Sequence, residues 1–367
     1  MHKEETIRFE VWRRATVSGL FVKCRLELVN RDASRHELWA NIAPRMLKEL
    51  KTMFKHKKGR SMTVGNHTIT LRPERYYWSD FLMALPAVLL LVLITYYPIA
   101  ELIRISFTDW RLTSREYSYV GMKNWQWLFT AKTSVKYLGN SLKVTFIYTF
   151  FNILIDLGLG LALAHLFKRL TKPFAAMRAL IFMPRYIAMS TCGIIFLWMF
   201  NTDYGVVNRM LEWVGVSNHI NWLGDGNMAL VTILILTGWH GIGYCMMIYL
   251  SALLGISKDY YEASSLDGAT GVQQFRYITL PLLSPTTLFL FITTFISSMK
   301  VYQSVDVMTG GGPRQKTEVM VYYIYRLAFD DNRLDRASVV ALLFFVILLI
   351  ITASTMRVTN KNVHYEA

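Results

Sequence analysis

The stretch Phe81–Ala100 reads F-L-M-A-L-P-A-V-L-L-L-V-L-I-T-Y-Y-P-I-A and contains no charged residue. A helix needs about 20 mostly apolar residues to cross a hydrocarbon core of roughly 30 Å, and this stretch has that length. Over the whole chain, 53% of the 367 residues are hydrophobic, which is too many for a pair of soluble domains. The composition and the run together indicate a membrane protein.

Five further apolar runs of similar length follow along the chain. They comprise residues 144–164, 177–200, 228–256, 277–299 and 337–356. Three of them carry an ionisable residue at membrane depth: Asp156 in 144–164, Arg185 in 177–200 and His240 in 228–256. Backbone amides must be satisfied within each helix where water is absent. We therefore expect an all-α, polytopic membrane protein with six transmembrane helices.

The excess of basic residues sets the expected orientation. The chain has 40 Lys and Arg against 25 Asp and Glu, and residues 1–80 contain 17 basic and 9 acidic residues. With residues 1–80 in the cytoplasm, 25 Lys and Arg lie on the inner side and 13 on the outer side; without them the numbers are 8 and 13. We expect a basic cytoplasmic N-terminal tail (1–80), a six-helix domain (81–358) and a cytoplasmic C-terminal tail (359–367). This distribution of charge along tails and loops does not indicate nucleic-acid binding.

A helical pattern runs through the tail between Arg31 and Lys58. Apolar residues recur there at spacings of three and four: Leu38, Trp39, Ile42, Met46, Leu50 and Phe54. With basic residues around them, they are typical of a basic amphipathic helix. Such a helix would lie on an anionic leaflet or pack on a partner subunit. A translation start at Met46, Met53 or Met62 would instead leave part of it unmade.

The chain carries no motif for a metal site or for catalysis. Cys24, Cys192 and Cys245 form no C-x-x-C or Cys/His cluster, and we expect three free thiols. The strings H-E-x-x-H and G-x-S-x-G are absent. The nearest approach to a nucleotide-binding loop, Gly310–Thr317, lacks the glycine before Lys316. We therefore expect a chain that is not an enzyme and that binds no metal or cofactor itself.

The segment Tyr260–Pro285 reads Y-Y-E-A-S-S-L-D-G-A-T-G-V-Q-Q-F-R-Y-I-T-L-P-L-L-S-P. Residues 258–266 are compatible with a helix, Asp267 and Gly268 form a turn, and residues 272–278 can resume the helix. Pro285 is expected to kink the start of the next membrane run. The segment thus predicts a short helical elbow, which an inner N-terminus places in the cytoplasm.

The string E-A-S-S-L-D-G-A followed by F-x-x-I-T-L-P resembles the EAA loop of permease subunits of bacterial ATP-binding-cassette (ABC) importers. Five flanking strings are similar to maltose-type and glycerol-phosphate-type carbohydrate permeases: F-T-D-W (107–110), V-G-M-K-N-W (120–125), F-N-T-D-Y-G (200–205), W-L-G-D-G-N (222–227) and T-G-G-G-P (309–313). The similarity covers about residues 81–358. Ser264 and Ser265 depart from it, because alanine is commoner at these positions.

The resemblance implies that loop 258–281 docks on a separate ATPase subunit and is moved by it. The implied ATPase-coupling residues are Glu262, Ala263, Asp267, Gly268 and Ala269. It also implies three partners in or at a bacterial cytoplasmic membrane: a homologous but different second permease, an ATPase dimer that uses the ATP, and an extracytoplasmic solute-binding protein. For the carboxylates of this loop, helix capping and helix-end charge are the alternative explanation.

The resemblance further implies a substrate pathway along the fourth and fifth of the six runs, residues 228–256 and 277–299. The implied residues are Thr237, Gly241 and Tyr244 in one run, and Thr294 and Ser298 in the next. Hydroxyl groups suit a neutral polyol, since they offer donors and acceptors without a desolvated charge. Packing by small residues is the alternative explanation.

Four ionisable residues near these runs need separate interpretations. We interpret Lys300 as reaching the membrane interface rather than gripping a phosphate. We interpret His240 as a packing residue with a hydrogen bond, on the helix face opposite Thr237. Asp156 in run 144–164 and Arg185 in run 177–200 are a candidate ion pair.

The function predicted from the sequence is that of a permease subunit forming half of the pathway for a sugar or oligosaccharide. A permease for glycerol phosphate or another polyol is the nearest alternative. A polytopic membrane enzyme is an alternative from a different class. A secondary transporter is disfavoured because six runs without an internal repeat are not typical of that class.

Overall fold

The computed structural model describes residues 8–16, 19–27, 61–64, 67–70, 78–169, 171–216 and 219–359. They divide into two units between Val92 and Leu93. The amphipathic helix predicted between Arg31 and Lys58 and nearly all of the predicted C-terminal tail lie outside the described residues.

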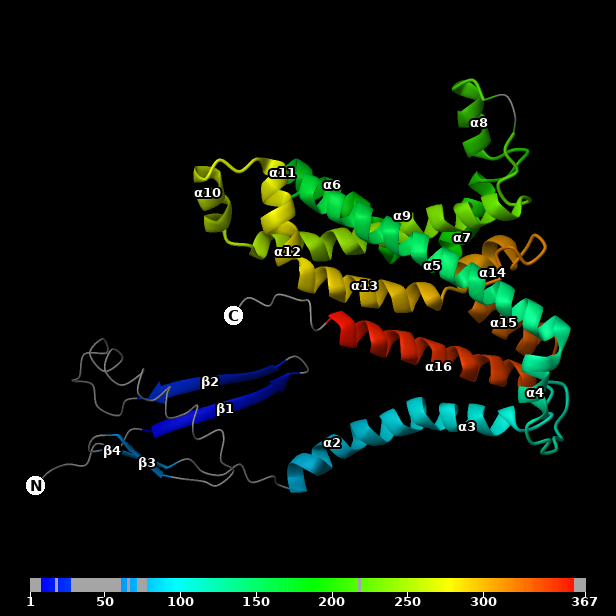
Figure 1. Ribbon diagram of the computed structural model, residues 1–367, viewed down its shortest axis with the longest axis horizontal. Helices are drawn as coiled ribbons and strands as arrows, with labels where there is room; N and C mark the ends of the chain where they lie inside the picture. The colour runs from blue at the N-terminus through cyan, green and yellow to red at the C-terminus, as the bar shows by residue number, and fades with distance from the viewer. Residues whose placement is uncertain are drawn as a thin grey trace, which may run out of the picture. The chain divides into compact units, whose positions relative to one another are not determined.

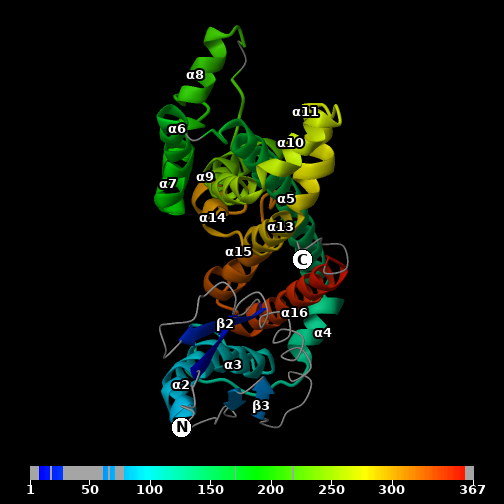
Figure 2. The ribbon, with the colours of Figure 1, turned by 90° about the vertical axis from the view of Figure 1, so that its left-hand side faces the viewer.

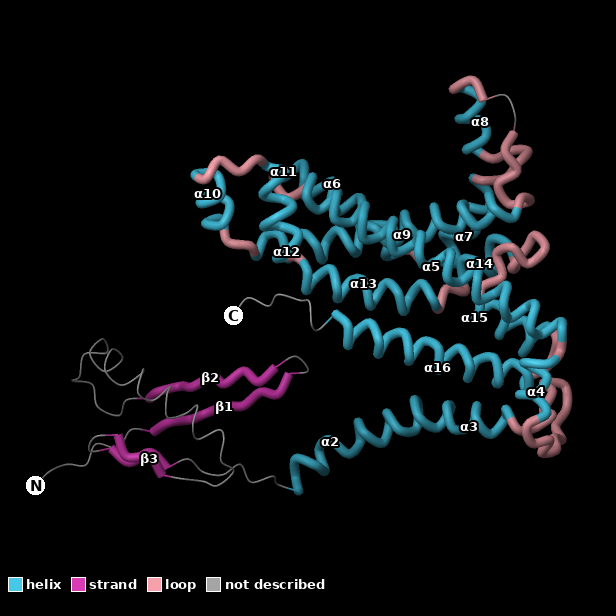
Figure 3. The backbone as a smooth tube through the Cα atoms, viewed as in Figure 1, coloured by secondary structure: helices cyan, strands magenta, loops and turns pink. Residues whose placement is uncertain are grey.

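The first unit contains two β-hairpins and one helix. Strand β1 (Arg8–Thr16) pairs antiparallel with β2 (Gly19–Glu27), and β3 (Ser61–Val64) pairs antiparallel with β4 (His67–Thr70), as Figure 3 shows. Helix α2 (Trp78–Leu91) follows. The predicted tail contained no strands, because only a helical period was recognised there.

The second unit consists of helices joined by turns, apart from one isolated β-bridge between Thr108 and Tyr119, and so confirms the predicted all-α class (Figure 1). The helices that precede residue 214 are η1 (Val92–Tyr96), which begins at the boundary, α3 (Tyr97–Ser106), α4 (Lys123–Thr130), α5 (Lys132–Leu166), α6 (Lys172–Phe182), η2 (Met183–Tyr186), α7 (Met189–Met199) and α8 (Val206–Trp213). The remaining helices are α9 (Gly226–Gly255), α10 (Lys258–Leu266), α11 (Gly271–Gln274), η3 (Phe275–Thr279), α12 (Leu280–Leu282), α13 (Ser284–Met299), α14 (Gln303–Thr309), α15 (Met320–Tyr325), η4 (Arg326–Asp330) and α16 (Leu334–Thr359).

Four continuous stretches among the described residues are long and apolar enough to cross a membrane: Leu82–Ser106, Lys132–Leu166, Gly226–Gly255 and Leu334–Arg357. Two bent helix pairs, one over residues 172–199 and one over residues 271–299, raise the number to six if each pair is one span. The six predicted runs fall within these helices. The boundary differs most at α5, which begins twelve residues before the predicted 144 because its first turns contain lysines.

The two bends have local causes. In the first pair the chain turns by 100° after η2, which contains Pro184, and Ile187 is extended between the two helices. The predicted run 177–200 is therefore not one straight helix. In the second pair the bend is 64°, and Pro285 lies in the first turn of α13, where the sequence predicted a kink.

Helix α9 lies in the middle of the second unit and contacts α5, α6, α7, α13 and α14 (Figure 2). Its glycines allow close approach. A Cβ added at Gly243 would lie 2.4 Å from the Ile181 carbonyl oxygen, and one at Gly238 would lie 2.8 Å from Ile155 Cγ2. On α5, a Cβ at Gly160 would meet Cys245 Cβ at 2.7 Å. Small residues at helix contacts are typical of membrane bundles, where close packing replaces the hydrophobic effect.

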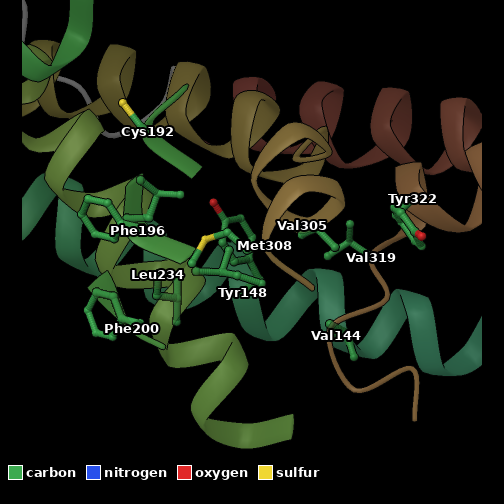
Figure 4. Packing of buried hydrophobic residues seen from close by; sticks show 12 residues of the cluster. Val144, Tyr148, Cys192, Phe196, Phe200, Leu234, Val305, Met308, Val319 and Tyr322 are labelled. Atoms are coloured by element: carbon green, nitrogen blue, oxygen red, sulfur yellow. The ribbon is translucent and has the colours of Figure 1, made fainter. Parts of the chain in front are cut away.

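Buried apolar side chains fill the space between α5, α7, α9, α14 and α15. Figure 4 shows this cluster, with Tyr148 from α5, Phe196 from α7 and Met308 from α14. Cys192 belongs to the same cluster, and both Cys192 and Cys245 are buried free thiols, as predicted. The cluster packs α7, which follows the break between η2 and α7, against α14. It therefore fixes the positions of helices that surround the cavity described next.

Candidate functional site

The segment between α9 and α13 folds as a helix, a tight turn and a second helical stretch, as the sequence predicted. We call residues 258–282 the elbow. Ser257 Oγ accepts a hydrogen bond from the Asp259 amide at 3.3 Å and caps α10. Gly268 has a φ of +80°, a conformation that glycine adopts without a Cβ clash. Thr270 and Gln273 then form a capping box that starts α11.

The residues expected to couple to an ATPase lie mostly on the exposed surface of the elbow. Glu262, Ala263, Asp267 and Gly268 are exposed, and Ala269 is half-buried. Within the described part of the chain, neither carboxylate takes part in an ion pair. Three apolar side chains on the elbow are also largely exposed: Leu266 (90%), Val272 (78%) and Tyr277 (71%). Exposed apolar side chains beside unpaired carboxylates are typical of a protein-binding surface.

A cavity of about 340 Å³ lies among α5, α9, the end of α13 and the break between η2 and α7. Most of the side chains that line it are polar, which is unusual for the interior of an apolar bundle. Such a volume falls at the lower end of the range for ligand pockets, about 300–1,000 Å³. The cavity is therefore large enough for a small polar solute.

Asn152 is the centre of a hydrogen-bond network at this cavity. Its Nδ2 donates to Asp156 Oδ2 at 2.9 Å and to Ser298 Oγ at 3.0 Å. Its Oδ1 accepts from Thr237 Oγ1 at 3.0 Å. One amide thus joins α5, α9 and α13, and all four side chains are buried.

Gly241 makes room for the Asp156 carboxylate. A Cβ added at Gly241 would lie 2.8 Å from both carboxylate oxygens of Asp156. Asp156 Oδ1 has no hydrogen-bond partner among the described residues, although the atom is buried. The missing Cβ at position 241 therefore lets the carboxylate lie between α5 and α9 beside the cavity.

Three basic side chains line the same cavity: Arg185, His240 and Lys300. His240 Nε2 lies 3.2 Å from the Ile187 carbonyl oxygen, in the break of the third run. The Arg185 guanidinium lies over the Tyr244 ring, 5.3 Å from its centroid. Asp156 and Arg185 both face the cavity but form no ion pair in the described structure, so the candidate pair is not made in this state.

Tyr302 lines the cavity just beyond the end of α13. Burial raises the pKa of its hydroxyl, and a hydrogen bond with Tyr325 raises that pKa further. The two rings pack with their centroids 5.0 Å apart. Tyr302 therefore offers the cavity a hydroxyl that stays neutral over the physiological pH range.

The structure brings most of the expected pathway residues together. Thr237, Gly241 and Ser298 line the cavity, and Tyr244 lies beneath Arg185. Thr294 is buried one turn before Ser298 and is not among the lining residues.

Sequence reasoning missed several residues at the cavity. The interpretation that His240 lies on the face opposite Thr237 is wrong, because residues three apart on a helix share a face. The expected hydrogen bond of His240 is present. Tyr148 and Asn152 were missed, although their spacing of four residues, which Asp156 continues, places all three on one face of α5. Lys300, interpreted as an interface residue, lines the cavity as well.

Comparison with known proteins identifies the family. Residues 156–360 match the family described as the binding-protein-dependent transport system inner membrane component. The chain belongs to this family of transport permeases.

Three similar proteins and two solved structures support this assignment. The permease is 31% identical to the sn-glycerol-3-phosphate transport system permease protein UgpA of Agrobacterium fabrum over 78% of this chain and 96% of that protein. It is 31% identical to the sulfoquinovosyl glycerol transport system permease protein SmoG of the same species (77% and 90%), and 32% identical to the probable ABC transporter permease protein YesP of Bacillus subtilis (74% and 87%). Two crystal structures of a bacterial alginate ABC transporter share its fold at 21% identity, with TM-scores of 0.67 and 0.68, over 77% and 79% of this chain and 96% of theirs.

These relatives are permease subunits, and the protein is accordingly a transport subunit of a binding-protein-dependent ABC importer rather than an enzyme. It is a multi-pass membrane protein. The matched segment contains both the elbow and the α9 and α13 sides of the cavity.

Thr237 and Thr293 provide a matched test of the Asn152 network. A hydroxyl has one hydrogen: Thr293 donates it to carbonyls of its own helix, whereas Thr237 shares it between the Ile233 carbonyl and Asn152 Oδ1. We expect Thr237→Val to lower the free energy of unfolding by about 1 kcal/mol more than Thr293→Val, the usual net contribution of one hydrogen bond. Thermal denaturation of the purified permease in detergent measures this difference. Equal effects of the two substitutions would show that the network contributes nothing.

Proposed function

We propose that this permease forms half of the translocation pathway for a sugar or oligosaccharide. The observation that carries the proposal is the polar cavity around Asn152 inside an apolar helix bundle. Polar groups at membrane depth are costly, and so they mark a solute path more often than a packing site.

The chemistry of the cavity suits a hydroxylated solute. Thr237, Ser298 and Tyr302 offer hydroxyl groups, and Asn152 offers an amide that both donates and accepts. Hydroxyl groups on a substrate can exchange hydrogen bonds with these side chains without leaving a charge desolvated. Relatives of this chain carry names that refer to sn-glycerol 3-phosphate and to sulfoquinovosyl glycerol, which are both hydroxylated compounds.

The elbow supplies the coupling in this proposal. A separate ATPase subunit docks on the surface formed by Glu262, Ala263, Asp267, Gly268 and Ala269 and hydrolyses the ATP. With the N-terminus in the cytoplasm, six spans place this surface on the cytoplasmic side. The complete transporter then contains a second, homologous permease, two ATPase subunits and an external solute-binding protein. The solved alginate transporter in complex with a periplasmic protein is one precedent for the last partner.

Gly268→Asp tests the coupling role. A Cβ at position 268 meets nothing within 4 Å, so the side chain fits, but it adds a charge and a strained φ on the docking surface. We expect the permease to fold. In proteoliposomes, the substrate-stimulated ATPase activity of its complex should be at least tenfold lower than that of the unsubstituted complex. Gly271→Asp is the control for charge, since position 271 has an ordinary φ at a helix start, where aspartate is favourable. Unchanged stimulation in Gly268→Asp would contradict the coupling role.

A glycerol-phosphate permease is the second candidate, and the cations of the cavity favour it. Arg185 and Lys300 both line the cavity beside a single carboxylate, Asp156. A phosphate group pairs well with guanidinium and ammonium groups. The hydroxyl groups of glycerol would then bind to the Asn152 network.

Lys300→Gln decides between the two candidates. If the substrate is sn-glycerol 3-phosphate, we expect uptake of the radiolabelled compound at low concentration to fall about tenfold, as for the loss of one charge-assisted hydrogen bond. Lys316→Gln is the control, because Lys316 is exposed and does not line the cavity. Equal uptake by the two variants would show that Lys300 does not bind the phosphate, and absence of uptake by the unsubstituted permease would rule the phosphate compound out and leave the neutral sugar.

A further inference from the structure

The inner side of the elbow contains a polar cluster around two serines. Ser264 Oγ and Ser265 Oγ both donate to the Tyr261 carbonyl oxygen, at 3.0 and 2.7 Å. These bonds use the hydroxyl hydrogens and leave lone pairs on both oxygens.

Gln274 uses these lone pairs to join two helices. Its Nε2 lies 3.2 Å from the Tyr261 carbonyl oxygen, 3.0 Å from Ser264 Oγ and 2.9 Å from Ser265 Oγ. An amide nitrogen has two hydrogens, so three acceptors share them. One side chain of α11 is therefore bonded to three points along the last turns of α10.

A second bond joins α10 to η3 (Phe275–Thr279), which leads through α12 into α13. The Tyr261 hydroxyl and Thr279 Oγ1 lie 2.9 Å apart, and Thr279 is 2% exposed. Along the chain, by contrast, α10 is connected to α11 through Gly268 and then Gly271, which permit rotation. The side-chain bonds therefore hold the angle between the two helices, because the connecting backbone does not.

We propose that Gln274 is the positioning residue of the coupling elbow. It holds α10 and α11 as one rigid body, so that displacement of the docking surface moves α13 instead of bending the turn at Gly268. This inference rests on the proposed coupling role of the elbow. The far end of α13 carries Ser298, which is bonded to Asn152 at the cavity, so a rigid elbow connects the docking surface to the substrate site.

The test uses the complete transporter in proteoliposomes, with ATP as the probe and ATPase activity measured with and without the solute-binding protein. Gln274→Met keeps the volume and removes all three bonds. We expect stimulation by the binding protein to fall about fivefold to thirtyfold, the range given by one or two hydrogen bonds of about 1 kcal/mol each, since about 1.4 kcal/mol corresponds to a factor of ten. Basal ATPase activity should not change. Amide hydrogen exchange in residues 258–266 should become faster. Gln126→Met, on an exposed position of α4, is the control for removal of a glutamine.

Substitution of the two serines is a second, independent test, and it does not require the Gln274→Met variant to fold. Ser264→Ala with Ser265→Ala removes two of the three acceptors, and we expect a twofold to fivefold loss of stimulation. In the Gln274→Met background, the same two changes should have no additional effect, because the bonds are already absent.

Two outcomes would overturn the inference: full stimulation in Gln274→Met, or full additivity of the serine and glutamine changes. The proposed coupling role is judged separately by Gly268→Asp. If Gly268→Asp abolishes stimulation while Gln274→Met retains it, the elbow couples but Gln274 does not position it. If both variants retain stimulation, the coupling role itself fails.

Discussion

The hydrogen bonds of Asn152 are the interaction on which the rest of this structure depends. Polar side chains inside a helix bundle within a membrane need partners in the protein, and Asn152 bonds to Asp156 on its own helix and to Thr237 and Ser298 on neighbouring helices. Asn152 serves all three and thereby joins α5, α9 and α13. The glycines of α9 allow the close approach that these short bonds require. The same groups that hold the helices together also line the cavity, so packing and the proposed solute binding share one set of residues.

Helix α13 connects the two parts of the proposed mechanism. Its first turn follows the elbow, and its last turn carries Ser298 at the cavity. A helix of 16 residues is about 24 Å long, and it transmits a displacement only if its ends are held firmly. Asn152 holds its far end through Ser298, and its near end continues from the elbow, in which the Tyr261–Thr279 bond joins α10 to η3. The break between η2 and α7, which His240 contacts, lies across the cavity and is the sharper of the two bends.

The sequence predicted those features that depend on local periodicity. The all-α class, the apolar runs and the turn at Gly268 follow from hydropathy and from glycine, and the structure contains each of them. It did not predict the 100° bend in residues 172–199, because the hydropathy of a bent pair equals that of a straight helix. The spacing within α5 predicts that Asn152 and Asp156 share one face of that helix. It does not predict which residues of other helices this face contacts. Cavity residues from different helices become visible only when the helices are packed.

The central claim is that the elbow docks on a separate ATPase. The most direct measurement is disulfide or bifunctional cross-linking from a cysteine placed at Ala263, which is exposed on α10, in membranes that contain the complete transporter. The native Cys192 and Cys245 are buried and should not compete, and Cys24 is removed by Cys24→Ser. The account predicts a cross-linked product that contains the permease and the ATPase subunit, and whose yield changes when ATP is added. A cysteine at position 263 that labels freely with a water-soluble maleimide, with no ATPase subunit cross-linked or copurified, would contradict it.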